Sequence, residues 1–229
     1  RLTVLNSPPN WKSKLSWTFK GNYMIRELLK RAGLIAGVLF AVGVTQAVSA
    51  KDLLEKPLAT AVFAGGCFWC VEAAYQDLDG VHDAVSGFTG GILKNPTYSG
   101  NHKGHWEAVK VTYNPETISY QRLLEIFWHN IDPFDAVGQF CDKGPSYRSA
   151  VFVANDKQRA LAEQSKQKVS EQFPKQTVET LIRPASTFYP VVEGHQDYYK
   201  KNPIRYRFYR AGCGRDNRLK EVWGKSAGH

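Results

Sequence analysis

Two cysteines and two aromatic residues stand together in the stretch GGCFWC, residues 65–70. The preceding TAVFAG is typical of a buried strand, and apolar residues then recur at helical spacing over residues 67–78. Cys67 is therefore expected at the N-terminal end of a helix. Unpaired backbone amides at such an end carry partial positive charge, which favours the thiolate of a nearby cysteine. The pattern predicts that Cys67 is ionised and acts as a nucleophile.

Cys70 follows one helical turn later, on the same face of the expected helix as Cys67. It could form a disulfide with Cys67 or shield it. A C-x-x-C pair also occurs in thioredoxin-like proteins, metal sites and structural disulfides. Zinc is disfavoured because no second C-x-x-C pair and no paired histidines match it, so no metal is expected.

Phe68 and Trp69 separate the two cysteines. Their side chains would place a bulky apolar surface beside a reactive sulfur. Such a surface suits a substrate that carries a small apolar group next to an electrophilic atom. Core packing is the alternative role for each aromatic.

Glu107 occupies an unusual position in the alternating strand HWEAVKVTY, residues 105–113. The two-residue period places Glu107 on the same face as Val109, Val111 and Tyr113. A carboxyl among apolar side chains loses hydration, which raises its pKa and keeps it protonated near neutral pH. Glu107 is therefore a candidate proton donor. An ordinary solvated glutamate at a strand end is the alternative.

The elements that must position these residues follow from the rest of the pattern. We expect a strand at 81–88, a glycine-rich loop at 89–105, a helix from Ser119 to 131 and a long loop at 132–149. After this loop we expect a strand at 150–154, a helix from Asn155 or Asp156 to about Phe173, a strand at 177–183 and a partly irregular tail at 193–224. Strands and helices in irregular alternation predict an α+β, two-layer domain, without internal repeats or a second domain.

The first fifty residues have a different character from the rest. Met24 opens a segment in which three basic residues precede an uncharged apolar run at 32–44, and small residues follow up to Ala50. This order is typical of a secretory signal peptide cleaved after Ala50. The apolar run is shorter than the roughly 20 residues that a membrane span needs. An uncleaved leader that anchors the protein is the alternative.

These features divide the chain into four expected parts: an upstream extension at 1–23 that does not belong to the fold, a signal peptide at 24–50, a linker at 51–58 and a catalytic domain at 59–229. We expect export, to a bacterial periplasm, with no stable membrane span after cleavage. The net charge is +9, but residues 1–50 hold seven Lys or Arg against Glu27 alone, so residues 51–229 carry only +3. Nucleic-acid binding is therefore not expected.

Six motifs occur along the chain in a fixed order: GGCFWCVEAAY, GFTGG, NPTYSG, GHWEAVKVTY, DKGPSYRSAVF and HQDYYKKNP. Together they resemble the peptide methionine sulfoxide reductases of type A, over residues 59–217. The resemblance implies a central mixed sheet with helices packed on it and a long coiled C-terminal region, a ferredoxin-like α+β fold. It implies reduction of the S epimer of methionine sulfoxide, in oxidised proteins or free, without metal or organic cofactor. A thioredoxin-like protein would supply the reducing equivalents, and we expect a monomer.

The resemblance also implies a role for each matching residue. Cys67 would attack the sulfoxide sulfur and be left as a sulfenic acid, while Glu107 would protonate the oxygen. Two tyrosines, Tyr98 and Tyr147, match those that hydrogen-bond the sulfoxide oxygen. Asp142 matches an acid that orders the site. Without the motifs, packing tyrosines and a loop-capping aspartate would be the simpler interpretation.

Phe68 and Trp69 would by the same resemblance form the pocket for the methyl group on sulfur. The cysteines depart from the family pattern: many members have glycine at the place of Cys70 and asparagine at that of Cys141, and many keep two recycling cysteines near the C-terminus, where this chain has only Cys213. The resolving thiol is therefore open between Cys213, which flanking glycines would let swing and which we prefer, and the nearer Cys70. Cys141 is expected to be buried.

Two other functions fit parts of the sequence. A thioredoxin-like disulfide oxidoreductase would use the C-x-x-C pair but would need no Glu107. A secreted binding domain held by two disulfides would suit an oxidising compartment and would leave no free thiol at Cys67.

Overall fold

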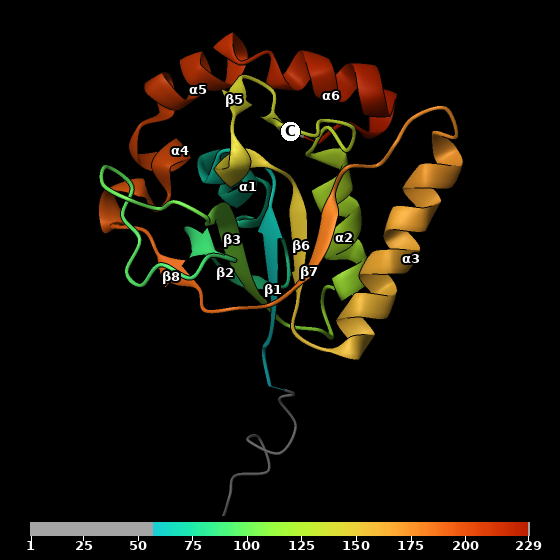
Figure 1. The fold of residues 1–229 in the computed structure, drawn as a ribbon, viewed down its shortest axis with the longest axis horizontal. Coiled ribbons are helices and arrows are strands. Elements are labelled where there is room, and N and C mark those ends of the chain that lie inside the picture. The colour runs from blue at the N-terminus through green and yellow to red at the C-terminus, as the bar shows by residue number, and fades with distance from the viewer. Residues whose placement is uncertain (1–56, 229) are drawn as a thin grey trace, which may run out of the picture. The chain divides into compact units, whose positions relative to one another are not determined.

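The computed structural model describes residues 57–228 (Figure 1). The expected upstream extension, signal peptide and most of the linker lie outside these residues. The described elements are β1 (Ala59–Ala64), α1 (Phe68–Tyr75), β2 (Val81–Thr89), β3 (Trp106–Tyr113), α2 (Tyr120–His129), β4 (Gly138–Gln139), β5 (Asp142–Lys143), η1 (Pro145–Tyr147), β6 (Ala150–Val153), α3 (Asp156–Gln172), β7 (Leu181–Pro184), β8 (Tyr189–Pro190), η2 (Glu193–His195), α4 (Tyr198–Lys201), α5 (Pro203–Gly212), α6 (Arg215–Trp223) and η3 (Gly224–Ser226).

Six strands form one mixed sheet in the order β7-β6-β1-β3-β2-β8. Among the strands of residues 57–228, β6 and β7 pair in parallel and the other pairs of this sheet are antiparallel. The four central strands and the helices α1 and α2 follow the order β1-α1-β2-β3-α2-β6, and β6-β1-β3-β2 is the strand order of a ferredoxin-like unit. This topology confirms the predicted α+β fold.

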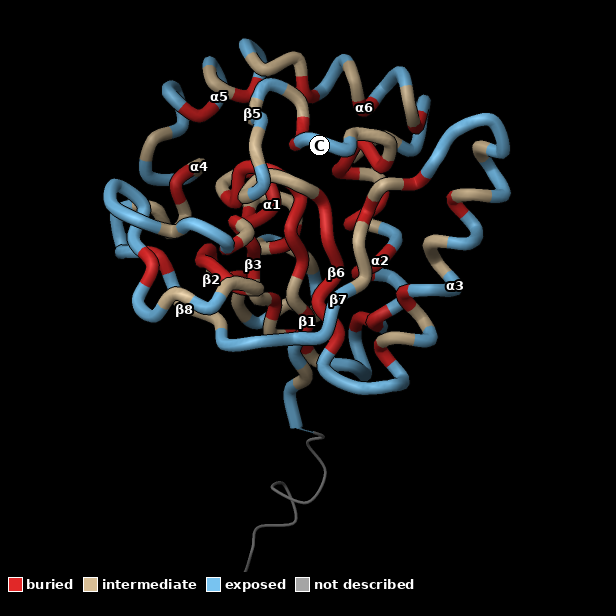
Figure 2. The backbone as a smooth tube through the Cα atoms, viewed as in Figure 1, coloured by how far each residue is buried: buried red, intermediate tan, exposed pale blue. Residues whose placement is uncertain are grey.

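The main core lies between the sheet and the helices α1 and α2. Phe63 of β1 is fully buried there, with its ring 5.2 Å from that of Tyr75 and 5.3 Å from that of Phe127. Burying one such side chain contributes about 1.5–3 kcal/mol to folding. The opposite face of the sheet holds a much smaller apolar cluster around Phe152. Figure 2 shows the buried stretches concentrated in the central strands and α1.

The predicted helix starts are confirmed for the two long amphipathic helices. Ser119 caps α2 by accepting a hydrogen bond from the Arg122 amide, and Asn155 caps α3 by accepting one from the Gln158 amide. Asn155 is the N-cap, so the choice left open between it and its neighbour is decided. Within the described residues, no helix is both long and apolar enough to cross a membrane.

A glycine pair makes the tight passage from β1 into α1. Gly66 has φ +84°, and a Cβ there would lie 2.6 Å from the Cβ of Gln139. A Cβ on Gly65 would lie 2.9 Å from the Cγ2 of Ile131. Both positions therefore need glycine, because Gln139 of the loop at 132–149 and Ile131 just before it pack directly against the start of α1.

The C-terminal region differs from the expectation of a long coil. Coil with two short strands is confined to residues 173–197, whereas 198–223 form three helices, which lie along one end of the sheet in Figure 1. The helical period in this tail is carried partly by arginines, because Arg210 and Arg215 are buried alongside Tyr206 and Trp223. Charged residues at core positions hide such a period from an analysis based on apolar residues.

Candidate active site

Cys67 is the N-cap residue of α1, and its side chain is only 6% exposed. The side chains of Cys70 and Tyr209 lie next to its sulfur and shift the pKa of its thiol in opposite directions, Cys70 upward and Tyr209 downward. Burial raises the pKa of the Cys67 thiol well above its usual value. The first amide of the helix, that of Phe68, is bound to the Glu107 carboxyl and not to the sulfur. The prediction that Cys67 is ionised is therefore wrong for the resting site.

Cys70 is the more acidic thiol of the pair. The neighbouring Cys67 side chain, helped by the guanidinium groups of Arg215 and Arg210, lowers the pKa of the Cys70 thiol to about 6. These arginines come from α5 and α6, so the last helices contribute to the acidity of a thiol in the first one. The two shifts favour a resting pair in which Cys67 keeps its proton and Cys70 is the thiol that ionises.

Glu107 lies on the buried face of β3, as the alternation predicts, and is 2% exposed. Its Oε2 accepts a hydrogen bond of 3.1 Å from the Phe68 amide, and the Tyr147 hydroxyl is a second hydrogen-bond partner. Loss of hydration, reinforced by the charge of Asp142, raises the pKa of Glu107 to about 8. The side chain is thus protonated near neutral pH, in the direction that the sequence predicts.

The two tyrosines and the aspartate predicted for the site are brought to the same place. Burial raises the pKa of Tyr98 to about 12, with the neighbouring Glu107 and Cys67 adding to the shift. The pKa of Tyr147 is also raised by burial, with further contributions from Glu107 and Asp142. Both hydroxyls therefore stay neutral hydrogen-bond donors. Asp142 accepts a hydrogen bond from the Tyr209 hydroxyl.

The rings of Phe68 and Trp69 lie near each other, with centroids 6.4 Å apart, but they differ in burial. Phe68 is fully buried and packs edge-on against Phe88, so it belongs to the core as well as to the site. Trp69 is half-buried; its ring stacks on Tyr198 at 3.7 Å between centroids, and its Nε1 donates to Nδ1 of His195 at 3.2 Å. Trp69 therefore forms an ordered aromatic wall that is still accessible.

Comparison with known proteins connects this geometry to a family. The family profile described as "Peptide methionine sulfoxide reductase" matches residues 59–227, which is more than half of the chain. The chain belongs to this family. The peptide methionine sulfoxide reductase MsrA 2 of Caulobacter vibrioides is 50% identical over 194 residues, covering 83% of this chain and 96% of the relative. MsrA of Bacillus subtilis is 48% identical over 174 residues, covering 74% and 97%.

Two solved structures of methionine sulfoxide reductases support the fold. The reduced form of Mxr1 from Saccharomyces cerevisiae has a TM-score of 0.60 at 28% identity, covering 65% of this chain and 87% of that one. Methionine sulfoxide reductase A of Corynebacterium diphtheriae has a TM-score of 0.56 at 30% identity, covering 64% and 76%.

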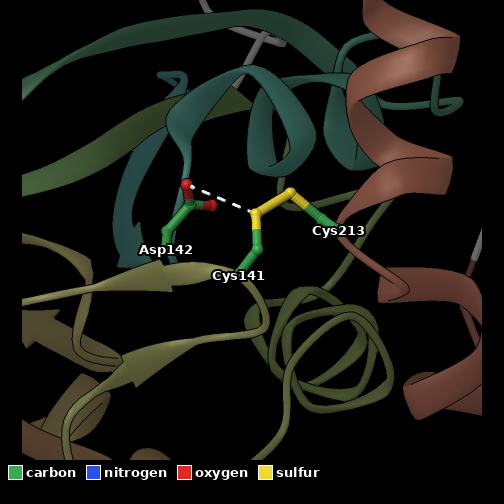
Figure 3. A group of neighbouring side chains, drawn as sticks. All are labelled: Cys141, Asp142 and Cys213. Carbon is green, nitrogen blue, oxygen red and sulfur yellow. Dashed lines mark hydrogen bonds between the residues drawn. A yellow bond between two sulfur atoms is a disulfide. The ribbon is translucent and has the colours of Figure 1, made fainter.

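A disulfide that the sequence did not predict joins two segments of this reductase (Figure 3). Cys141 is bonded to Cys213, with Cα atoms 4.8 Å apart, and Cys67 and Cys70 are free. Cys141 is exposed, so the expectation that it is buried is wrong. Cys213, our preferred resolving residue, has no thiol to offer in this state. Residues 57–228 have one disulfide and two free cysteines, so the structure does not match the alternative of a binding domain held by two disulfides.

The disulfide also bears on metal binding. In the described residues, Cys141, Asp142 and Cys213 are the one group of acidic, histidine or cysteine side chains close enough to hold an ion, with ligand atoms within 4.8 Å. Bonded to each other, the two sulfurs are not thiolate ligands, and thiolates are the form in which cysteine binds metals.

Several residues of the site were missed by the sequence analysis. Tyr209, Tyr198 and His195 come from the tail, which was expected to be partly irregular. Arg215 is 2% exposed and donates to the carbonyl oxygens of Gly65 at 3.2 Å and Asn130 at 2.7 Å. The spacing of Tyr206, Arg210 and of Arg215, Leu219, Trp223 at four-residue intervals is the signal that could have revealed these helices.

Proposed function

We propose that the protein reduces the S epimer of methionine sulfoxide, in oxidised proteins or as the free amino acid. The observation that carries the proposal is the shared position of a buried thiol and a neutral carboxyl: Cys67 begins α1, and Glu107 is hydrogen-bonded to the next amide of the same turn. A sulfoxide needs a nucleophile at sulfur and a proton at oxygen. The neutral hydroxyls of Tyr98 and Tyr147, next to Glu107, suit the oxygen, and Asp142 helps to order them.

The attacking thiolate comes from the hydrogen bond within the cysteine pair. Transfer of the Cys67 proton to the Cys70 thiolate gives a Cys67 thiolate and a Cys70 thiol. The Cys67 sulfur then forms a bond to the sulfoxide sulfur while Glu107 delivers its proton to the oxygen. The resulting hydroxyl passes from the substrate sulfur to the Cys67 sulfur, and the new sulfur–sulfur bond breaks. Methionine leaves, Cys67 becomes a sulfenic acid and Glu107 a carboxylate. Sulfur of Cys67 is oxidised and sulfur of methionine is reduced by the same two electrons.

Trp69 provides the wall against which the methyl group of the sulfoxide packs. Burial of one methyl contributes about 0.8 kcal/mol, and loss of the ring also removes the hydrogen bond to His195. Trp69→Ala is expected to lower kcat/KM about tenfold or more, with a much smaller change in the midpoint of thermal unfolding. Steady-state kinetics with a sulfoxide peptide and thermal melts measure the two effects. Equal losses of activity and stability would show that the ring is a packing residue only.

Cys70 is proposed as the resolving thiol, because it lies one helical turn from Cys67, with its amide donating to the Cys67 carbonyl oxygen at 3.1 Å. Its sulfur attacks the sulfenic sulfur of Cys67, the Cys70 proton leaves with the hydroxyl as water, and a Cys67–Cys70 disulfide forms. A thioredoxin-like dithiol then reduces this disulfide by thiol exchange, so no metal or organic cofactor is required.

Cys70→Ser is expected to release one equivalent of methionine per protein and then to stop with thioredoxin-like reductants. A sulfenic-acid trapping reagent should label Cys67 in this variant. Peptide mapping of wild type treated with sulfoxide, without reductant, should show Cys67 joined to Cys70. Cys67 joined to Cys213 would transfer the resolving role back to the C-terminal cysteine.

From the sequence alone, we further propose that residues 24–50 direct export to a periplasm and are removed after Ala50, and that the mature protein acts as a monomer. The leader and its order of basic, apolar and small residues support export. The mass of the protein recovered from the periplasmic fraction tests the cleavage point, and light scattering tests the monomer.

A further inference from the structure

Tyr209 of α5 lies between two groups of the site. Its hydroxyl donates a hydrogen bond to the Asp142 carboxylate and lies close enough to the Cys67 sulfur to lower the pKa of that thiol. Its ring packs edge-on against Trp69, with centroids 5.7 Å apart. A phenol has a single proton, so the sulfur and the carboxylate are alternative acceptors for the same donor.

The same two segments are also joined covalently. Cys213 follows α5 and donates its backbone N–H to the Tyr209 carbonyl oxygen at 2.9 Å, so the disulfide is attached one helical turn from Tyr209. At the other end of the disulfide, Cys141 directly precedes Asp142, and Figure 3 shows both side chains beside the start of α1. The disulfide and the Tyr209–Asp142 hydrogen bond therefore connect α5 to the same short segment.

We propose that Tyr209 is a further catalytic residue, whose hydroxyl donates to the Cys67 sulfur as negative charge gathers there, and that the Cys141–Cys213 disulfide positions it. The assignment rests on the proposed function and adds a donor on the nucleophile side of the reaction. Asp142 holds the hydroxyl in the resting site, and the hydroxyl turns to the sulfur when the thiolate forms. No covalent bond to Tyr209 forms or breaks.

The groups around Cys67 explain why a thiolate there needs a hydrogen-bond donor. The sulfur faces Cys70 from α1, Glu107 from β3 and Tyr209 from α5, with Tyr98 and Tyr147 nearby. Neither Cys70 nor Glu107 favours a thiolate at position 67, because each raises the pKa of that thiol, whereas the Tyr209 hydrogen bond lowers it. Burial and the nearby charge raise the pKa of Tyr209 itself, so its hydroxyl keeps its proton.

Tyr209→Phe tests the catalytic role while keeping the ring on Trp69. We expect the rate of the first methionine released, without reductant, to fall about tenfold or more, because a hydrogen bond to a charged group is lost. KM should change less than kcat. Alkylation of Cys67 by iodoacetamide, followed at that residue by mass spectrometry, should shift to higher pH. The alkylation assay needs no substrate, so it reports on Tyr209 even if the protein does not reduce sulfoxides.

Tyr199→Phe is the matched control. Tyr199 also donates to an aspartate, Asp77, at 2.7 Å, but this hydrogen bond is exposed and does not involve the residues of the site. This variant should keep the wild-type rate and the wild-type alkylation profile. An unchanged first-turnover rate and an unchanged alkylation profile in Tyr209→Phe would overturn the proposal.

Cys141→Ser tests the positioning role of the disulfide. This variant leaves Cys67, Cys70 and Tyr209 in place but removes the covalent link. We expect the first-turnover rate to fall and the alkylation profile to move in the same direction as in Tyr209→Phe, by a smaller amount. A normal first turnover with slow steady-state turnover would overturn the positioning role and assign the pair to electron transfer instead.

Discussion

Cys67→Ser is expected to abolish reduction of methionine sulfoxide, lowering the rate about 10⁴-fold or more. The reason is chemical: a serine hydroxyl is not ionised near neutral pH and cannot accept an oxygen from the sulfoxide, whereas a thiolate becomes a sulfenic acid. When catalytic residues act as a unit, loss of the nucleophile alone commonly removes most of the rate enhancement. The measurement is methionine released from each resolved epimer of a sulfoxide peptide.

The control for this prediction lies within the cysteine pair. Cys70→Ser also changes one buried sulfur to oxygen in α1, but it should still release one equivalent of methionine from the S epimer. Circular dichroism of both variants shows whether the fold is kept. Methionine formation at the wild-type rate in Cys67→Ser would refute the assignment of the nucleophile, and preference for the R epimer in wild type would refute the proposed stereochemistry.

Glu107→Gln is expected to lower the rate of the first turnover about 100-fold or more at pH 7, because the proton donor for the sulfoxide oxygen is lost. In the wild type the donor has a pKa of about 8. It is therefore protonated below this pH, and the wild-type rate should fall as the pH rises through about 8. An amide does not titrate, so this fall should be absent in the variant.

Stability provides an independent check on Glu107. The pKa of this carboxyl is raised from 4.5 to about 8 in the folded protein. Between these values the folded protein keeps a proton that the unfolded chain has lost, so the contribution of Glu107 to the free energy of unfolding falls as the pH rises. Denaturant titrations should therefore show that the free energy of unfolding of Glu107→Gln, relative to that of wild type, is higher at pH 9 than at pH 5. An identical pH dependence for the two proteins would mean that Glu107 is not held neutral.

Much of the site could be predicted because its chemistry is local in the sequence. Two-residue alternation placed Glu107 on the buried face of β3, and the glycine pair marked the turn into α1. The charge of Cys67 could not be predicted in this way. It depends on burial, on which group uses the first amide of the helix, and on Cys70, whose pKa is lowered in turn by arginines 140 or more positions away, Arg210 and Arg215.

The pairing of the cysteines could not be predicted from the sequence either. Flanking glycines made Cys213 a plausible mobile thiol, but the spacing of the cysteines does not say which of them lies within bonding distance of Cys213. Only the packing of α5 over the segment before Asp142 brings Cys141 within bonding distance of Cys213. The helices of the tail were missed because arginines occupy core positions there, which an apolar period does not register.

The contact from Arg215 to the carbonyl of Gly65 has a consequence for how the protein is made. A ribosome releases Cys67 and Cys70 long before it releases the helix that holds Arg215. Until α6 has emerged, the nascent chain has its thiols but not all of the guanidinium groups that lower the pKa of Cys70. We therefore expect both thiols to be most vulnerable to wrong pairing during synthesis, and to gain protection only when the final helices dock.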